Sequence, residues 1–329
     1  VECEFIDADG CLVTPGFIDP HQHLLGGSGE EGFSTQTPEI HAAEIISAGI
    51  TTVVGCLGVD TTMKTMPGLL AKAKALKEEG LNAYVWSGGY NVPPTSITKN
   101  VRNDILFIDE IIGAGEIAVA DERSTDPDFH ELAHLVHDAY VGGMLSKKAG
   151  VTHFHIGEGP KRLRLLRDLI EKDDVAPEWL YPTHITRSEE LMLEAVELAG
   201  RGSFIDIDTV EEDLLKWLKF YRDNGGDLAK LTVSSDSSIT SPQNLFNQIR
   251  ECLLESDFSI EEILSLVTRN TAKALKFTDK GEIKPGNTAD ILCLDKKSFE
   301  LREVISGGKH LLKNGKIAFK EAFLQESNR

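Results

Sequence analysis

The strongest constraint on the fold is a regular alternation of short apolar, β-branched runs with amphipathic segments of helical length. The runs that favour strands are residues 16–21, 51–57, 82–87, 116–120, 151–156, 180–185, 203–208 and 231–235. The helical segments are residues 38–48, 69–79, 102–112, 128–146, 161–171, 189–199, 210–224 and 243–255. Strands that are each followed by a helix predict an α/β fold of the (β/α)8 TIM-barrel type. An open doubly wound sheet is the alternative, but no Gly-rich dinucleotide-binding turn is obvious after the first strand.

The chain changes character after this alternating part. Two more helices are expected at 260–267 and 271–275, and turn-forming residues then dominate 280–290. Strands are expected at 291–294, 301–305 and 317–323. With the first residues of the chain, these segments predict a small β-sandwich domain built from 1–13 and 280–329, beside a barrel domain formed by 14–279. The N-terminal part of the small domain is expected to be incomplete, because the sequence starts with Val1 in the middle of a strand.

Composition argues against several classes of partner. The 53 acidic and 34 basic residues give a net charge of −19, which repels nucleic acid and anionic membrane surfaces. No apolar run reaches the length of a membrane span, and no signal peptide opens the chain. The five cysteines are odd in number and widely spaced, without a CxxC motif, as expected for reduced thiols. We therefore expect a cytoplasmic protein that binds neither nucleic acid nor membrane.

Histidines and carboxylates stand at the ends of several predicted strands, where the functional residues of barrels collect. His21 and His23 lie one residue apart on the first strand, so their side chains point the same way. The complete set is His21, His23, Glu116, His155, His184 and Asp236. Six ligands exceed the needs of one tetrahedral zinc ion and suit two divalent ions, most often Zn2+, that share a bridging carboxylate. A metal-bridged hydroxide would attack a polarised carbonyl, with Asp236 as base toward the nucleophile and acid toward the leaving nitrogen.

The motifs that contain these residues resemble the amidohydrolase superfamily, as does the turn-rich segment 281–290. More narrowly, the segments that resemble the isoaspartyl (β-aspartyl) dipeptidases are 15–27, 87–93, 121–124 and 181–187. The similarity runs over nearly the whole chain. It implies a homo-oligomeric hydrolase that cleaves the amide bond of a β-aspartyl dipeptide.

The same resemblance implies roles for residues around the metal ligands. Glu30 would hold the α-amino group of the substrate, and Tyr90 would polarise the scissile carbonyl. Arg123 and Arg187 would grip carboxylates, a task that suits the bidentate geometry of guanidinium groups.

Several positions depart from the family pattern. Glu116 stands where the family has a carboxylated lysine, seven residues before the arginine in both cases. Ser28, which we count among the substrate-binding residues, replaces a glycine, and Val59 replaces a threonine that helps to hold the aspartyl carboxylate. The loop 237–242 after Asp236 is also different. These departures leave the metal ligands in place and concern the choice of substrate.

Other motifs and other functions have to be weighed against this interpretation. Residues 130–134 spell HExxH, the helix motif of zinc proteases, but the barrel prediction places them on an outward-facing helix with solvated histidines. Asp206 and Asp208 on the seventh strand are expected to form hydrogen bonds at a loop end. The alternative functions are hydrolysis of a cyclic amide or an N-acyl amino acid on the same centre, and a catalytically silent scaffold. The complete set of ligands argues against the scaffold.

Overall fold

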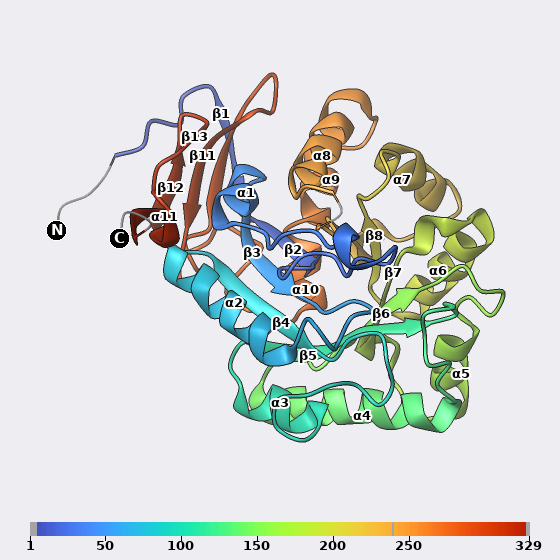
Figure 1. Cartoon of the computed structure of the whole chain (residues 1–329). Coiled ribbons are helices and arrows are strands. Elements are labelled where there is room, and N and C mark those ends of the chain that lie inside the picture. Colours follow the sequence, from blue (N-terminus) through green and yellow to red (C-terminus); the bar gives the residue numbers. More distant parts are fainter. Residues whose placement is uncertain (1–4, 239, 327–329) are drawn as a thin grey trace.

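Parallel strands follow one another in chain order at the centre of the computed structural model, which describes residues 5–238 and 240–326 (Figure 1). One sheet has the order β2–β3–β4–β5–β6–β7, and β8 and β9 form a parallel pair of their own. The bounds are β2 (Phe17–Gln22), β3 (Ile50–Gly55), β4 (Asn82–Ser87), β5 (Ile111–Val119), β6 (Thr152–Ile156), β7 (Leu180–Thr183), β8 (Ile205–Asp208) and β9 (Leu231–Ser234). This is an α/β fold that is consistent with the predicted barrel.

Hydrogen bonds tie the first and last of these strands together at one end. The amide of Asp236 donates to the carbonyl of His21 at 3.0 Å, and the amide of His23 donates to the carbonyl of Ser237 at 2.8 Å. On the other side, the Thr183 hydroxyl at the end of β7 donates to a carboxylate oxygen of Asp206 in β8 at 2.8 Å. No ladder joins β7 to β8 within the described residues, so closure into an eight-stranded barrel stays a prediction.

Helices connect the strands and cover the outer faces of the sheets (Figure 1). Their bounds are α1 (Ala42–Ser47), α2 (Met66–Glu79), α3 (Val101–Phe107), α4 (Phe129–Ser146), α5 (Arg164–Lys172), α6 (Glu189–Arg201), α7 (Leu214–Asp223), α8 (Gln243–Glu255), α9 (Ile260–Leu266) and α10 (Arg269–Ala274). Local signals set their ends: α4 begins with a capping box between Asp128 and Glu131, and α2 ends where Gly80 takes a φ of 113°. Among the described residues, we find no helix with both the length and the apolar character needed to cross a membrane.

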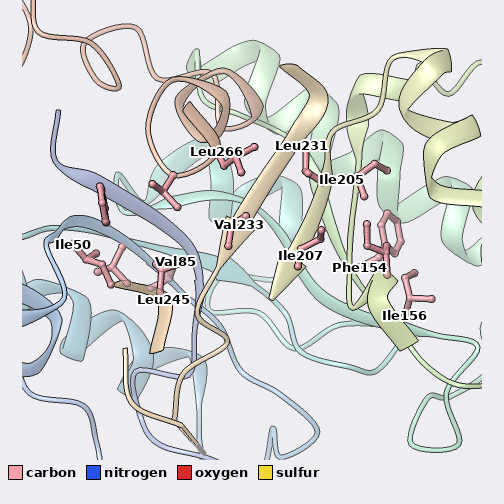
Figure 2. Close-up of a cluster of buried hydrophobic side chains, with 14 of the residues drawn as sticks. Ile50, Val85, Phe154, Ile156, Ile205, Ile207, Leu231, Val233, Leu245 and Leu266 are labelled. Carbon is pink, nitrogen blue, oxygen red and sulfur yellow. The ribbon is translucent and has the colours of Figure 1, made fainter. Parts of the chain in front are cut away.

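The apolar core lies between the strands and these helices (Figure 2). Ile205 and Ile207 of β8 and Leu231 and Val233 of β9 are fully buried there. Side chains alternate along a strand, so the polar residues between them face the opposite side of the sheet. Strands β8 and β9 thus turn an apolar face toward the helices and a polar face toward the opposite side of the sheet.

The fourth parallel strand begins earlier than the sequence predicted. It was expected at 116–120, after a helix over 102–112, but α3 ends at Phe107 and β5 already starts at Ile111. A short apolar run such as this one fits a helix end and a strand start equally well. Pairing with β4 and β6 on either side makes this run a strand, and it places Glu116 inside a fully buried strand.

The chain ends form one antiparallel sheet with the order β1–β10–β11–β12–β13. Its bounds are β1 (Cys11–Pro15), β10 (Ile291–Asp295), β11 (Leu301–Ser306), β12 (Lys309–Lys313) and β13 (Lys316–Ile317). Both chain ends contribute as predicted, but a sandwich is not confirmed, since the antiparallel strands of the described residues form a single sheet. The strand expected at 317–323 is wrong, because β13 ends at Ile317 and α11 (Ala322–Glu326) follows; β12 was missed. The boundary expected after residue 13 falls within β1, and residues 1–4 and 327–329 lie outside the described part.

A buried ion pair joins this sheet to the parallel strands. Asp290, directly before β10, accepts hydrogen bonds from the Lys280 ammonium at 2.9 Å, from the amide of Gly307 at 2.8 Å and from the side chain of Asn82 at 3.0 Å. Asn82 starts β4, so one carboxylate connects the two parts of the structure. The side chains of Lys280 and Asp290 are 2% and 7% exposed.

We expect Asp290→Ala to destabilise the whole chain. The substitution leaves the Lys280 ammonium buried without its anion, which costs roughly 3–5 kcal/mol. Chemical denaturation measures this loss. Asp126→Ala is the matched control, because the pair of Asp126 with Lys161 is exposed and such pairs contribute little. Equal stability of the Asp290→Ala and Asp126→Ala proteins would contradict the assignment.

Candidate metal centre

The six residues predicted as metal ligands meet in one place, at the carboxyl ends of the parallel strands. They come from β2 and the residue after it, from β5 and β6, and from the positions just after β7 and β9. In chain order these are His21, His23, Glu116, His155, His184 and Asp236. Two of them, His184 and Asp236, take left-handed backbone conformations with φ of 61° and 46°. Such conformations are costly for non-glycine residues and persist where the surrounding structure enforces them.

Glu116 lies between two pairs of histidines. Its Oε1 is 2.9 Å from His155 Nδ1 and 3.3 Å from His184 Nε2. Its Oε2 is 3.2 Å from His21 Nε2 and 3.7 Å from His23 Nε2. Each oxygen of one carboxylate therefore faces a different pair of imidazoles, which is the arrangement a bridging carboxylate requires.

Asp236 approaches the same group from the cavity side. Its Oδ1 is 3.2 Å from His21 Nε2 and 3.1 Å from His23 Nε2, and its Oδ2 is 3.9 Å from His184 Nε2. Its side chain is 16% exposed, whereas that of Glu116 is fully buried. Asp236 thus touches the ligand group and the cavity at once.

The donor atoms fit divalent metal ions. Ligand atoms of three residue groups lie within 4.8 Å of one another: His21, His23, Cys56 and Glu116; His21, His184 and Asp236; and Glu116, His155 and His184. Both ring nitrogens of His21 and the Oε2 of Glu116 are buried and have no hydrogen-bond partner among the described residues. Unpaired buried polar atoms are costly, and coordination of a cation would satisfy them.

The electrostatics of the group also favour a cation. Burial would raise the pKa of Glu116, but the charge of His21 and hydrogen bonds from His155 and His184 hold it well below its usual value. Burial would lower the pKa of His184, yet Asp208 beside it raises the value to about 10. The Glu116 carboxylate is therefore an anion, and His184 holds a proton that a metal ion would replace.

Two carboxylates outside the predicted ligand set orient its histidines. Asp208 Oδ2 lies 2.8 Å from His184 Nδ1, and Asp121 Oδ2 lies 2.9 Å from His155 Nε2. Carboxylates that hold the second ring nitrogen of a ligand histidine set its tautomer and its orientation. For Asp208 the sequence analysis expected hydrogen bonding only, and for Asp121 it stated no role. The position of Asp208 at the end of a strand was the available signal.

Cys56 is a further neighbour that sequence reasoning missed. Its Sγ lies 3.6 Å from His23 Nδ1 and 4.0 Å from His23 Nε2. Burial raises the pKa of this thiol to about 12, so without a metal ion it is protonated and weakly donates to the carbonyl of Gln22 at 3.5 Å.

The residues expected to bind substrate line a cavity of about 440 Å³ that opens above the ligands. The cavity walls include Ser28, Glu30, Val59, Tyr90, Arg123, Arg187 and Asp236. The Tyr90 hydroxyl lies 2.9 Å from His155 Nδ1, and burial raises the pKa of Tyr90 well above its usual value, so the hydroxyl keeps its proton.

The charged residues at the mouth of this cavity are partly paired with one another. Arg123 donates to both carboxylate oxygens of Glu30 at 2.9 Å and is held in place by Asp121 at 2.8 Å. Arg187 contacts Glu158 at 3.4 Å, and the Ser28 hydroxyl accepts from the amide of Asp60 at 3.3 Å.

The HExxH motif lies elsewhere. His130 and His134 are exposed on α4. Among the residues that the structure describes, neither belongs to a cluster of side chains that could hold a metal ion. The expectation that these histidines are solvated agrees with the structure.

Comparisons with known proteins identify the family to which the chain belongs. Profiles described as the amidohydrolase family match residues 4–116 and 121–311. The structure of a β-aspartyl dipeptidase from Fervidobacterium islandicum AW-1 is 41% identical, with a TM-score of 0.92 over 96% of this chain and 87% of that one. A complex of the β-aspartyl dipeptidase from the same organism with a β-Asp-Leu dipeptide gives 40% identity and a TM-score of 0.91, over 96% and 88% of the two chains.

Sequence relatives are more distant. Imidazolonepropionase of Staphylococcus saprophyticus is 26% identical over 356 residues, and the match covers 95% of this chain and 84% of the imidazolonepropionase chain. The family matches and the 41% identity confirm the resemblance found in the sequence motifs. The chain therefore belongs to the amidohydrolase family and is a metal-dependent hydrolase.

Proposed function

We propose that this protein hydrolyses the amide bond of β-aspartyl (isoaspartyl) dipeptides with two divalent metal ions. The observation that carries the proposal is the position of Glu116, whose two oxygens face two separate pairs of histidines. The complex of the 40% identical β-aspartyl dipeptidase with β-Asp-Leu supports the choice of substrate.

In this proposal His21 and His23 would hold one ion, His155 and His184 would hold the other, and Glu116 would be shared between them. Asp236 completes the set. Imidazole and carboxylate donors in these numbers suit Zn2+ best. When bound, the two ions supply Lewis acidity for the scissile carbonyl and lower the pKa of water so that hydroxide forms near neutral pH.

Asp236 is placed to move the proton. Burial would raise its pKa, but the charge of His21 and the hydrogen bond from His23 lower it, so the group is a carboxylate at neutral pH. It can therefore accept a proton from the attacking water and pass it to the leaving nitrogen. Tyr90, which stays protonated, would donate a hydrogen bond to the carbonyl oxygen as negative charge develops there.

The charges around the cavity complement a β-aspartyl dipeptide. Such a substrate carries an ammonium and a carboxylate on the aspartyl side and a second carboxylate beyond the scissile bond. Glu30 supplies the negative charge for the ammonium, and Arg123 and Arg187 supply two cations for the carboxylates. Ser28 adds a hydroxyl to the cavity wall, whereas Val59 offers no polar contact.

We also propose the domain organisation and the assembly that the sequence implied. The strands β2–β9 with their helices would close into a (β/α)8 barrel over 14–279, while 1–13 and 280–329 form the small β domain. A homo-oligomer would match the family resemblance, and the widely spaced cysteines would suit the cytoplasm.

The first prediction separates the metal centre from the HExxH helix. His134→Ala should leave metal content and turnover nearly unchanged, because this side chain is exposed on α4. His155→Ala should release metal, because it removes an imidazole that faces Glu116. Metal analysis of both purified variants provides the measurement. Loss of metal from His134→Ala with retention by His155→Ala would refute the proposed centre.

The second prediction concerns the bridge. Glu116 carries its carboxylate in its own side chain, so metal content and activity should not depend on bicarbonate. The matched variant is Glu116→Lys, which restores the family's lysine and should need added bicarbonate to recover metal and turnover. Metal reconstitution with and without bicarbonate tests both proteins. A bicarbonate requirement of the unsubstituted protein would mean that another residue forms the bridge.

The third prediction concerns the substrate. We expect cleavage of β-Asp-Leu but little cleavage of α-Asp-Leu. Arg187→Ala should raise KM roughly tenfold to a hundredfold with a smaller effect on kcat, because a hydrogen bond to a charged group contributes about 1.5–3 kcal/mol.

The control for this series is Arg162→Ala, which removes an arginine that pairs with Glu194 outside the cavity. Steady-state kinetics on the dipeptide panel provide the readout. Equal cleavage of both linkages, or activity only on cyclic amides or N-acyl amino acids, would reject the dipeptidase function and leave the metallohydrolase standing.

A further inference from the structure

We propose that the ion pair between Glu30 and Arg123 makes the cavity selective for substrates that carry both an ammonium and a carboxylate. The inference rests on the proposed function and deepens it, because it names the two charged groups that a dipeptide must bring together to enter this site.

Arg123 is occupied by carboxylates of the protein itself. Its Nη1 donates to both oxygens of Glu30 at 2.9 Å. Its Nε and Nη2 donate to the two oxygens of Asp121 at 2.8 Å. Each nitrogen of the guanidinium group therefore has an anionic partner, and a carboxylate of a substrate has to compete with one of these partners.

Glu30 is the partner that can yield. Its side chain is 47% exposed, whereas that of Asp121 is 4% exposed. Asp121 also accepts a hydrogen bond from the backbone amide of Arg123 at 2.8 Å, and its Oδ2 lies 2.9 Å from the Nε2 of His155. Because exposed ion pairs contribute little to stability, a ligand that enters the cavity displaces Glu30 and leaves Asp121 in place.

This exchange of partners is balanced only when the ligand brings both charges. A substrate ammonium then pairs with Glu30, a carboxylate of the same molecule pairs with the Nη1 of Arg123, and two ion pairs replace one. An acid without an ammonium would separate Arg123 from Glu30 and leave Glu30 as an unpaired anion beside the ligand. Such an unpaired charge opposes binding, so the pair excludes the wrong ligand as well as holding the right one.

The ligand that isolates this effect is N-succinyl-leucine. It has the skeleton and both carboxylates of β-Asp-Leu but lacks the amine. If the ion pair acts as proposed, N-succinyl-leucine is a weak ligand because Glu30 holds Arg123, and it binds more tightly once Glu30 releases Arg123.

Inhibition of β-Asp-Leu cleavage by N-succinyl-leucine measures this release. We expect Glu30→Gln to lower the inhibition constant of N-succinyl-leucine by roughly twofold to fivefold, the contribution of a partly exposed ion pair. The same substitution should raise KM for β-Asp-Leu roughly tenfold or more, because the ammonium loses its charged partner. The two ligands therefore respond in opposite directions.

A second variant separates the ion pair from simple repulsion between Glu30 and the anionic inhibitor. Glu30→Asp keeps the negative charge but shortens the side chain by one methylene, which withdraws the carboxylate from the Nη1 of Arg123. We expect it to lower the inhibition constant as well. Repulsion alone would leave the constant unchanged in Glu30→Asp, and that result would overturn the role of the pair.

The matched control is Glu31→Gln, which removes the neighbouring carboxylate. Glu31 is exposed and does not line the cavity, so neither constant should change. A protein that cleaves β-Asp-Leu, yet binds N-succinyl-leucine equally well with and without the Glu30 substitutions, would overturn this inference and leave the proposed function intact. A protein that does not cleave β-Asp-Leu would instead overturn the proposed function and this inference with it.

Discussion

The placement of one carboxylate between four imidazoles is the constraint on which the rest of the site depends. Glu116 is fully buried, and an unpaired charge in such a position would cost many kcal/mol. Its partners come from β2, β6 and the end of β7, so these strands must end at the same level around β5. The parallel sheet achieves this because every strand runs in the same direction. The histidines can balance the charge of Glu116 only when the strands are in this register.

A layer of hydroxyls around a second buried carboxylate supports that register. Asp206 in β8 accepts hydrogen bonds from Thr183 at the end of β7 and from Thr232 and Ser234 in β9. Burial raises the pKa of Asp206 to about 6, although these hydrogen bonds act in the opposite direction. The side chains connect three strands at the point where no ladder between β7 and β8 is recorded among the described residues. This layer holds the strand ends that carry His184 and Asp236.

The groups expected to bind substrate stand on loops, and buried or partly buried carboxylates hold those loops in place. Asp104 on α3 is fully buried and accepts hydrogen bonds from the Ser87 hydroxyl at 2.7 Å and from the amides of Ile97 and Thr98. It thereby closes the loop that carries Tyr90. The metal ligands stand on or next to strands, whereas the substrate groups stand on loops or, for Arg187, in the short 3-10 helix Ile185–Arg187. A change on a loop, such as Val59, therefore lies outside the elements that position the centre.

The sequence by itself determined the alternation of strands and helices, and with it the residues at the strand ends, because side-chain periodicity is a local property. The motif from His21 to His23 could be placed in this way before any contact was known. Only the tertiary structure brought Cys56 to His23, because the thiol lies in an apolar run and β2–β3 pairing sets its neighbours. The start of β5 and the strand β12 likewise depended on the strands beside them. Local pattern defines which side chains share a face, while pairing between distant segments decides which of them touch.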